Sequence, residues 1–215
     1  MKRTFVVFEG IDGSGTSTQA LLLQSTLTKA GLRVFLTSEP TTGPVGQLIR
    51  QIIGKRVFVS DRAHIVDAML AYLFVADRFD HLHNDVDGIF KKLENGYVVI
   101  STRYYLSSYA YNPHSAHDFE LVKGINQQFP MADITFYLDC PVEEAMQRIA
   151  TSGRSPDRNE NKDNLIRVQQ NYERALREYK GPLFRINALL SAQEQHQQIA
   201  EVVLKFLEGG KQQCR

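Results

Sequence analysis

A glycine-rich turn near the start of the chain lies between an apolar run and a helix-forming stretch. The apolar run is Phe5–Phe8, and the helical stretch begins at Gln19. Between them, Gly10, Gly15 and Ser17 match three positions of the pattern G-x-x-x-x-G-K-[ST]. In that pattern the backbone N–H groups of the turn cradle phosphates at the start of a helix. The strand before the turn and the helix after it are the context that this pattern requires, so the turn is predicted to bind phosphates.

Position 16 departs from this pattern, because Thr16 stands where a phosphate-binding loop carries lysine. That lysine normally supplies a positive charge beside the β- and γ-phosphates of a nucleotide. A glycine-rich turn without a ligand is the structural alternative, but the strand–loop–helix context argues against it. Ser17 is the predicted Mg²⁺ ligand. The residues predicted to bind the nucleotide phosphates are Gly10, Gly13, Ser14, Gly15, Thr16, Ser17 and Thr18.

The composition fits one domain of ordinary size. The chain has 215 residues, of which 43% are hydrophobic, so it can bury one sizeable core, and we expect a single domain over residues 1–215. A net charge of +1 gives no electrostatic reason to expect nucleic-acid binding. Cys140 and Cys214 match no metal-binding spacing, and no apolar stretch approaches the length of a membrane span. We therefore expect a cytoplasmic protein that binds neither nucleic acid nor membrane.

Short β-branched or aromatic runs alternate with longer helical patterns along the chain. This alternation predicts an α/β protein with a parallel five-stranded sheet flanked by helices in three layers. Asp61 and Ser191 are the expected N-caps of two helices. The predicted strands are Thr4–Phe8, Arg33–Thr37, Tyr97–Ser101, Ile134–Leu138 and Leu183–Ile186. The predicted helices are Thr16–Ala30, Val45–Ile53, Asp61–His81, Val86–Glu94, Val142–Ala150, Lys162–Tyr179 and Ala192–Glu208.

In such a sheet, ligands bind beside the carboxyl ends of the strands. The residues at those ends are Glu9, Ser38-Glu39-Pro40, Thr102-Arg103 and Asp139. A polar segment at about residues 150–161 interrupts the regular alternation, and it carries Arg154 and Arg158. The segment is either a solvated connector or a lid that closes over phosphates.

Taken in order, these motifs resemble the thymidylate kinase family of nucleoside monophosphate kinases over almost the whole chain. Ser38-Glu39-Pro40, followed by Gly46 and Ile49-Arg50, resembles the family's R-E-P-G-G-T…G…I-R segment. Residues 73–78 read L-F-V-A-D-R and resemble its L-F-A-A-D-R helix. The run from Ser101 to Asn112 resembles its D-R-Y/H…S-x-x-A-Y-Q segment, and residues 157–160 resemble its D-R-x-E lid end.

The resemblance implies a P-loop kinase fold and a reaction in which ATP, with Mg²⁺, phosphorylates dTMP to dTDP on the route to dTTP. By position, Phe74 stacks on thymine, although a core phenylalanine is the structural alternative. Arg78 and Arg103 hold the acceptor's monophosphate, and Arg50 joins them. For each arginine, a surface salt bridge is the structural alternative. The other residues assigned to the acceptor site by position are Asp12, Pro40, Ser107, Ser108, Tyr111, Asn112 and Glu160.

Within this set, the resemblance gives more specific roles to four residues. Ser108 contacts the edge of the base, and Tyr111 packs where the 2′-hydroxyl of a ribose would project. Asp12 lies near the acceptor sugar and Mg²⁺, and Glu160 helps to order a closed lid. Asn112 stands where the family usually carries glutamine.

The family divides by the position of a catalytic arginine. One branch carries it in the phosphate loop at the position of Gly13, whereas the other has basic residues in the lid. Gly13 with Arg154 and Arg158 resembles the second arrangement, so Asp12, Arg103, Arg154 and Arg158 are the predicted catalytic residues. Arg148 occupies the position of the residue beside adenine. Known members form homodimers, so we expect one here.

Two departures concern the charge around the transferring phosphoryl group. Thr16 replaces the loop lysine, and Thr102 replaces the aspartate that usually precedes Arg103. If the two side chains face each other, the exchange is nearly neutral, and our hypothesis is that the pair changed together. Lost activity is the competing outcome. The replacement charge would come from Arg103, Arg154, Arg158 or Lys162, and the sequence does not choose among them.

Three functions therefore stay open at this stage. The leading one is an active dTMP kinase. The second is a kinase for another nucleoside monophosphate or a deoxynucleoside, and the third is a nucleotide-binding protein with weak or no catalysis. The acceptor-site arginines argue against the third, because a protein that only senses ATP has no need of them.

Overall fold

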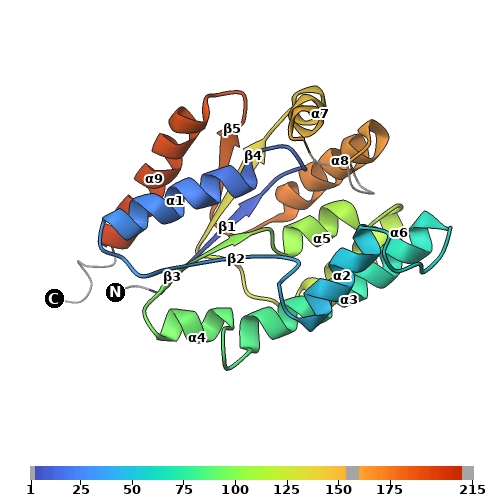
Figure 1. Ribbon diagram of the computed structural model, residues 1–215, viewed down its shortest axis with the longest axis horizontal. Helices are drawn as coiled ribbons and strands as arrows, with labels where there is room; N and C mark the ends of the chain where they lie inside the picture. Colours follow the sequence, from blue (N-terminus) through green and yellow to red (C-terminus); the bar gives the residue numbers. More distant parts are fainter. Residues whose placement is uncertain (1–2, 154–159, 210–215) are drawn as a thin grey trace.

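Five parallel strands form one sheet at the centre of the computed structural model, which describes residues 3–153 and 160–209. The strand order is β2-β3-β1-β4-β5, so the chain begins in the middle of the sheet and builds outward on both sides (Figure 1). This confirms the predicted parallel sheet. The strands are β1 (Thr4–Glu9), β2 (Val34–Ser38), β3 (Val98–Thr102), β4 (Ile134–Asp139) and β5 (Leu183–Asn187).

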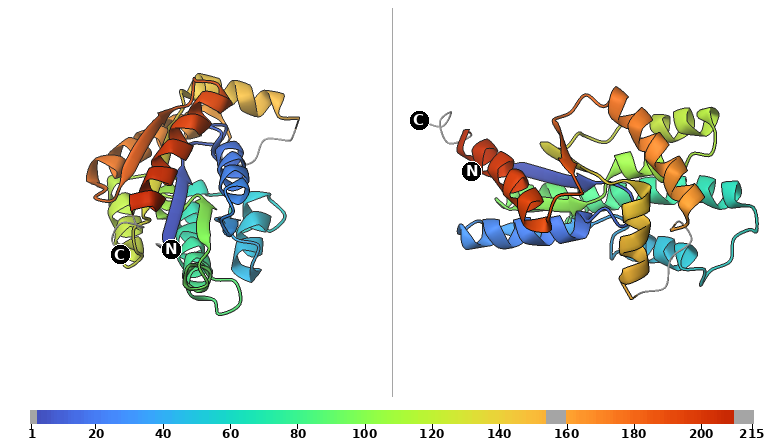
Figure 2. Two further views of the ribbon diagram at one scale, coloured as in Figure 1. Left: turned by 90° about the vertical axis from the view of Figure 1, so that its left-hand side faces the viewer. Right: turned by 90° about the horizontal axis from the view of Figure 1, so that it is seen from above.

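Helices cover both faces of the sheet, which gives the three expected layers. Helices α1 and α9 pack together on one side, and α5 and α8 pack against each other on the opposite side, beside α3 (Figures 1 and 2). The helices are α1 (Thr16–Lys29), α2 (Pro44–Ile53), α3 (Ala63–His83), α4 (Ile89–Glu94), α5 (Tyr105–Tyr111), α6 (Ala116–Asn126), α7 (Val142–Thr151), α8 (Lys162–Glu178) and α9 (Ala192–Gly209).

The central strand β1 is buried along its whole length. Its apolar run does not alternate with polar residues, because helices cover both of its faces. Phe8 of β1 stacks on Phe136 of β4, with ring centroids 5.3 Å apart. Because β1 ends at Glu9, the glycine-rich loop begins at the edge of the sheet where the strands end.

The predicted strands and helices are confirmed to within a few residues, with three differences. Helices α5 and α6 were not predicted, and α4 begins at Ile89 rather than at Val86. Asp61 is not a cap, because α3 begins after Arg62 without a side-chain cap. Ser191 does cap α9: its hydroxyl accepts the Glu194 N–H at 3.3 Å, and the Glu194 carboxylate accepts the Ser191 N–H at 2.9 Å.

Two further predictions concern the lid arginines and membrane-spanning helices. Arg154 and Arg158 of the expected lid lie outside the described residues. Within residues 3–153 and 160–209, no helix combines the length and the apolar character that a membrane crossing needs.

Candidate active site

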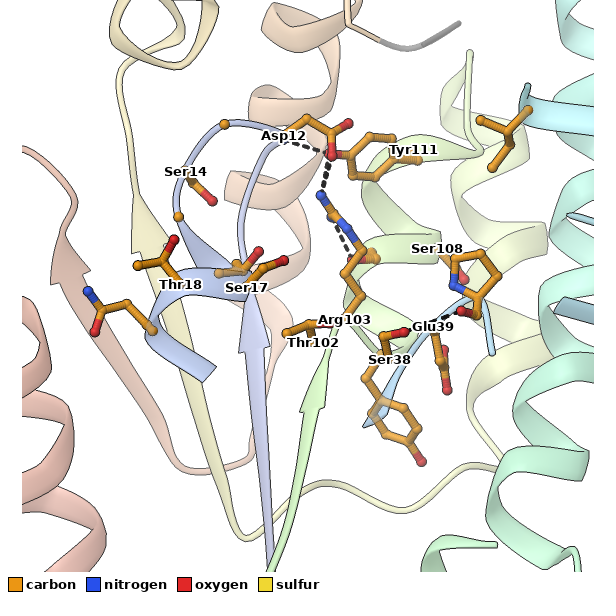
Figure 3. Close-up of a pocket in the computed structure, with 18 of the residues that line it drawn as sticks. Asp12, Ser14, Ser17, Thr18, Ser38, Glu39, Thr102, Arg103, Ser108 and Tyr111 are labelled. Atoms are coloured by element: carbon orange, nitrogen blue, oxygen red, sulfur yellow. Dashed lines mark hydrogen bonds and ion pairs between the residues drawn. The ribbon is translucent and has the colours of Figure 1, made fainter. Parts of the chain in front are cut away.

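A cavity of about 1100 Å³ opens at the carboxyl ends of the strands, as the fold class predicts. The glycine-rich loop forms one wall, and the ends of β2 and β3 form the floor (Figure 3). Helices α3 and α5 close the side toward Phe74, and the β5–α9 loop closes the side toward Arg148. A cavity of this volume can hold two small-molecule ligands.

The glycine-rich loop has the backbone geometry of a phosphate cradle. Gly13 and Gly15 adopt φ values of +81° and +100°, and Gly15 is the N-cap residue that precedes α1. An added Cβ at Gly13 would lie 2.5 Å from the carbonyl oxygen of Ala145 on α7. The hydroxyl-bearing residues Ser17 and Thr18 line the cavity from the first turn of α1 (Figure 3). The N–H groups of that first turn have no partner within the helix, which suits an anionic ligand.

Arg103 connects the end of β3 to the loop above it. Its Nη2 donates to Asp12 Oδ1 at 2.6 Å and to the Tyr111 hydroxyl at 3.1 Å (Figure 3). Its Nη1 donates to the Gly10 carbonyl at 2.9 Å. Its backbone φ of +71° is unusual for a residue with a side chain. The surrounding contacts hold this arginine between the glycine-rich loop and α5.

Glu9, at the end of β1, organises the residues beneath Arg103. Its carboxylate accepts the Tyr104 N–H at 2.9 Å, the Ser107 hydroxyl at 2.6 Å and the Tyr172 hydroxyl at 2.9 Å. Ser107 in turn accepts from Arg103 Nη1 at 3.1 Å. Burial raises the pKa of Glu9 from 4.5 to about 7, against the opposing effect of these donors and of the nearby guanidinium.

Arg78 is fully buried beside Glu39, with which it forms an ion pair at 2.6 Å. The same guanidinium donates to Asn126, and to the Ser108 hydroxyl at 3.1 Å. Its charge is therefore neutralised inside the protein. The guanidinium thus lies beside Ser108 with its charge balanced by Glu39.

Arg50 has a different environment from the other cavity arginines. It donates to the carbonyl oxygens of Pro40 and Thr41 and to the Ser38 hydroxyl. Arg103 and Arg148 each pair with a carboxylate, as Arg78 does, whereas Arg50 has no carboxylate partner in the described part of the chain. Its positive charge is thus the one most available to a bound anion.

The side of the cavity near α3 and α5 suits a planar base. Phe74 lines it together with Leu70, and Asn112 lies at its edge with only 5% of its surface exposed. Asn112 Nδ2 donates to the Asp67 carbonyl at 3.4 Å, and its Oδ1 has no hydrogen-bond partner among the residues described. A buried amide oxygen of this kind is suited to accept from a ring N–H once the site adjusts around a ligand.

The opposite side of the cavity suits the second ligand. Arg148 lies between the phosphate loop and the β5–α9 loop, because its guanidinium donates to Ser14 O at 3.4 Å and to Ala188 O at 2.7 Å. Its Nε pairs with Glu144 at 2.8 Å. Leu189 and Leu190 complete this wall, so the side offers a cationic plane and apolar surface for a nucleobase.

The structure brings most of the predicted site residues to this one cavity. Gly10 lies below the lining as an acceptor for Arg103, and Glu160 is buried but does not line the cavity. Lys162 pairs with Glu143 at 3.4 Å and also lies off the lining. The predicted residues on the lining are Asp12, Gly13, Ser14, Gly15, Thr16, Ser17, Thr18, Pro40, Arg50, Phe74, Arg78, Arg103, Ser107, Ser108, Tyr111, Asn112 and Arg148.

Sequence reasoning missed several residues that support the site. Glu9 and Glu39 are among the predicted residues at the strand ends, but the sequence assigns a role to neither. Tyr172, on α8, contacts Glu9 and Ser107 although it lies 163 positions from Glu9 in the chain. The position of a carboxylate at the end of a buried strand could have identified Glu9, whereas nothing in the sequence around Tyr172 points to the site.

Comparisons with known proteins identify the family of the chain. The family model described as thymidylate kinase matches residues 8–199. A probable thymidylate kinase of Thermococcus kodakarensis is 39% identical over 206 residues, covering 94% of this chain and 98% of the relative. A putative thymidylate kinase of Treponema pallidum is 37% identical, covering 80% of this chain and 79% of that protein. A thymidylate kinase of Desulfotalea psychrophila is 36% identical and covers 72% of each chain. With a match of this extent, the chain belongs to the thymidylate kinase family.

Proposed function

We propose that this protein transfers the γ-phosphoryl group of ATP to dTMP, which yields ADP and dTDP and supplies the synthesis of dTTP. The observation that carries this proposal is the cluster of Arg103, Asp12 and Tyr111, joined by bonds of 2.6 to 3.1 Å between the phosphate loop and α5. It connects a phosphate cradle on one side to a base-sized space on the other. A protein that only bound ATP would have no use for that second space.

ATP is proposed to lie along the loop, with its phosphates on the N–H groups around Gly13 and Gly15 and its adenine beside Arg148. Mg²⁺ carried with the nucleotide would neutralise phosphate charge during transfer. The Ser17 hydroxyl, which lines the cavity, is the proposed protein ligand, with Asp12 nearby. Hydroxyl and carboxylate oxygens suit this ion, which protein sites usually bind through few protein ligands and substrate phosphates.

The acceptor is proposed to lie on the other side, with thymine on Phe74 and its monophosphate toward Arg50 and Arg103. Arg50 is suited to this role because its charge has no described carboxylate partner, and guanidinium groups match phosphate oxygens well. Arg78, neutralised by Glu39, is reassigned from the phosphate to the edge of the base. Ser108 and Asn112 would share that edge, and Pro40 and Ser107 would support the site around the phosphate.

Transition-state charge is proposed to be balanced by Arg103 together with the lid arginines Arg154 and Arg158, and Glu160 would help to order that lid. Thr16 and Thr102 both line the cavity as neutral residues. Preorganised charges in a site of this kind contribute several kcal/mol, on the order of 3 to 4 per donor, to transition-state stabilisation. With threonine in place of a charged residue at positions 16 and 102, other side chains must supply this stabilisation. Otherwise the turnover of the protein will be low.

A homodimer is the proposed assembly. On α3, Ile65, Tyr72 and Phe79 are spaced by seven residues and are 40%, 55% and 54% exposed. Residues seven apart lie on one face of a helix, so these side chains form an apolar stripe. Such a stripe is suited to pack against the same stripe of a second copy.

The decisive experiment measures ADP release with Mg²⁺-ATP and a panel of acceptors: dTMP, dUMP, UMP and dCMP. The proposal expects kcat/KM for dTMP to be the highest, and expects turnover to be lost in the Arg103→Ala variant. A different preferred acceptor would identify a kinase for another nucleoside monophosphate. Binding of ATP and dTMP without turnover would overturn the catalytic assignment.

A further inference from the structure

Helix α5 carries three residues of the proposed acceptor site, Ser107, Ser108 and Tyr111, yet it is short and weakly stabilised by itself. It spans only seven residues, from Tyr105 to Tyr111, and has no side-chain cap at its N-terminus. A helix leaves its last carbonyl groups without partners inside the helix, and one of two turns has little stability in isolation. The position of Tyr111 must therefore be set by something outside α5.

Helix α8 supplies that support through two side chains one turn apart. Arg167 Nη1 donates to the carbonyl oxygen of Tyr111 at 3.2 Å and to that of Pro113 at 2.5 Å. Asn171 Nδ2 donates to the carbonyl oxygens of Ala110 at 2.9 Å and Pro113 at 3.2 Å. Residues at i and i+4 share one helix face. The carboxyl end of α5 is thus capped from outside by a guanidinium and an amide.

The guanidinium of Arg167 is itself held in place. Its Nε and Nη2 donate to Asn164 Oδ1 at 3.3 and 2.7 Å, and the Asn164 N–H donates to Asn161 Oδ1 at the start of α8. A cation at the carboxyl end of a helix also interacts favourably with the helix dipole. Arg167 therefore combines a fixed direction with a favourable charge at the end of α5.

The capped end of α5 includes Tyr111, whose side chain contacts Asp12 and Arg103. The Tyr111 hydroxyl accepts the Asp12 N–H at 3.0 Å and the Arg103 Nη2–H at 3.1 Å. The Tyr111 backbone is held by Arg167 of α8, and its hydroxyl is held by Asp12 of the glycine-rich loop and by Arg103, which follows β3. A shift of the backbone would move the ring within the cavity, whereas Arg167 does not itself line the cavity.

We propose that Arg167 is a positioning residue that fixes Tyr111 and thereby sets the preference for deoxyribose in the acceptor. The sugar preference rests on the proposed function, in which Tyr111 occupies the space that a 2′-hydroxyl would need. The fixing of Tyr111 does not rest on it. Asn171 is the second member of the same cap.

The test compares Arg167→Ala with Arg174→Ala. Arg174 lies two turns further along α8, pairs with Glu120 at 2.5 Å and covers the ring of Phe119, so it joins α8 to α6 rather than to Tyr111. For each variant, kcat and KM are measured with dTMP and with its ribonucleotide counterpart. Arg167→Ala is expected to raise KM for dTMP about tenfold and to lower the preference for dTMP over the ribonucleotide, because hydrogen bonds from a charged donor are lost. In Arg167→Ala, KM for ATP is expected to stay unchanged. Arg174→Ala is expected to change neither KM for dTMP nor the preference for dTMP over the ribonucleotide.

A second readout does not depend on activity. In the wild type, the Asp12 amide is bonded to the Tyr111 hydroxyl, so its hydrogen exchange reports the position of that ring. Arg167→Ala is expected to speed this exchange, whereas Arg174→Ala is not. Unchanged exchange of the Asp12 amide, or an equal loss of activity with both sugars, would overturn the inference. Failure of the wild type to phosphorylate dTMP would instead overturn the proposed function, and the amide exchange would still decide whether Arg167 fixes Tyr111.

Discussion

Ser38, at the end of β2, lies directly opposite Thr102, at the end of β3, in the register of the parallel sheet. Both line the cavity, and both stand where the family motifs have a charged residue, arginine at 38 and aspartate at 102. Charged side chains at such neighbouring positions would attract each other. The register therefore indicates that positions 38 and 102 are the two positions at which a pair of opposite charges is replaced by neutral residues. Thr16 is then a separate loss of one positive charge.

This relationship predicts how charge can be restored. Thr102→Asp alone should lower kcat, because it places an unpaired negative charge near the phosphates. Ser38→Arg is expected to rescue that variant more fully than Thr16→Lys does. Steady-state kinetics check this prediction: kcat of each double variant is compared with the value expected if the two single substitutions acted independently.

The opposite outcome would support our hypothesis that positions 16 and 102 changed together. In that case Thr16→Lys would rescue Thr102→Asp, and Ser38→Arg would not. A large rise in turnover for the Thr16→Lys/Thr102→Asp variant, by orders of magnitude over the wild type, would mean that the natural protein is a weak kinase.

Removal of the Arg50 guanidinium should weaken acceptor binding selectively. Arg50→Gln keeps a polar side chain but loses the charge that no described carboxylate neutralises. We expect KM for dTMP to rise about 10- to 100-fold, since a charge-assisted hydrogen bond contributes about 1.5 to 3 kcal/mol. KM for ATP should change little. An equal rise in both KM values would mean that Arg50 supports the whole cavity rather than the acceptor phosphate.

The sequence was sufficient to predict the parallel sheet, because β-branched runs alternate with helical patterns throughout the chain. It did not reveal α5, whose residues Tyr105–Tyr111 are mostly tyrosine and serine, with modest helix propensity. This helix is stabilised by burial and by the donors of Arg167 and Asn171, which come from more than 50 positions away. Tertiary contacts of this kind leave no local pattern.

The same limit applies to the arginines of the site. The motifs identified Arg50, Arg78 and Arg103, but their different charge environments depend on which carboxylates the fold brings near. Glu39, at the turn after β2, reaches Arg78 on α3 across 39 positions. The sequence could not predict that this pair would be buried with its charges balanced, while Arg50 would bond, among the described residues, to carbonyl and hydroxyl oxygens.

Glu9 should make the stability of the protein depend on pH. Burial raises its pKa from 4.5 to about 7, so the folded protein holds a proton that the unfolded chain releases between these values. The stabilisation linked to that proton is complete below pH 4.5 and is lost as the pH rises through 7. Urea denaturation of the wild type and of Glu9→Gln across this range checks the prediction. The difference in unfolding free energy should change by about 3 kcal/mol at most.

The Glu9→Gln variant serves as its own reference, because other titrating groups are common to both proteins and cancel in the difference. Arg103 and Tyr172, which face Glu9 from β3 and α8, are also unchanged. A difference that stays flat from pH 4.5 to 7 would contradict the raised pKa and would mean that the donors around Glu9 outweigh its burial.

Gly13 offers a test of close packing between the phosphate loop and α7. Gly13 and Gly31 have nearly equal positive φ values, +81° and +79°, so alanine at either position meets the same backbone strain, about 1 kcal/mol. At Gly13 the added Cβ would lie 2.5 Å from the Ala145 carbonyl oxygen, whereas at Gly31 no atom of the described residues lies within 4 Å of it. Thermal unfolding should therefore show a larger loss for Gly13→Ala than for Gly31→Ala, and KM for ATP should rise only in Gly13→Ala. Equal effects of the two substitutions would mean that α7 moves aside without cost, and that the loop tolerates a side chain at position 13.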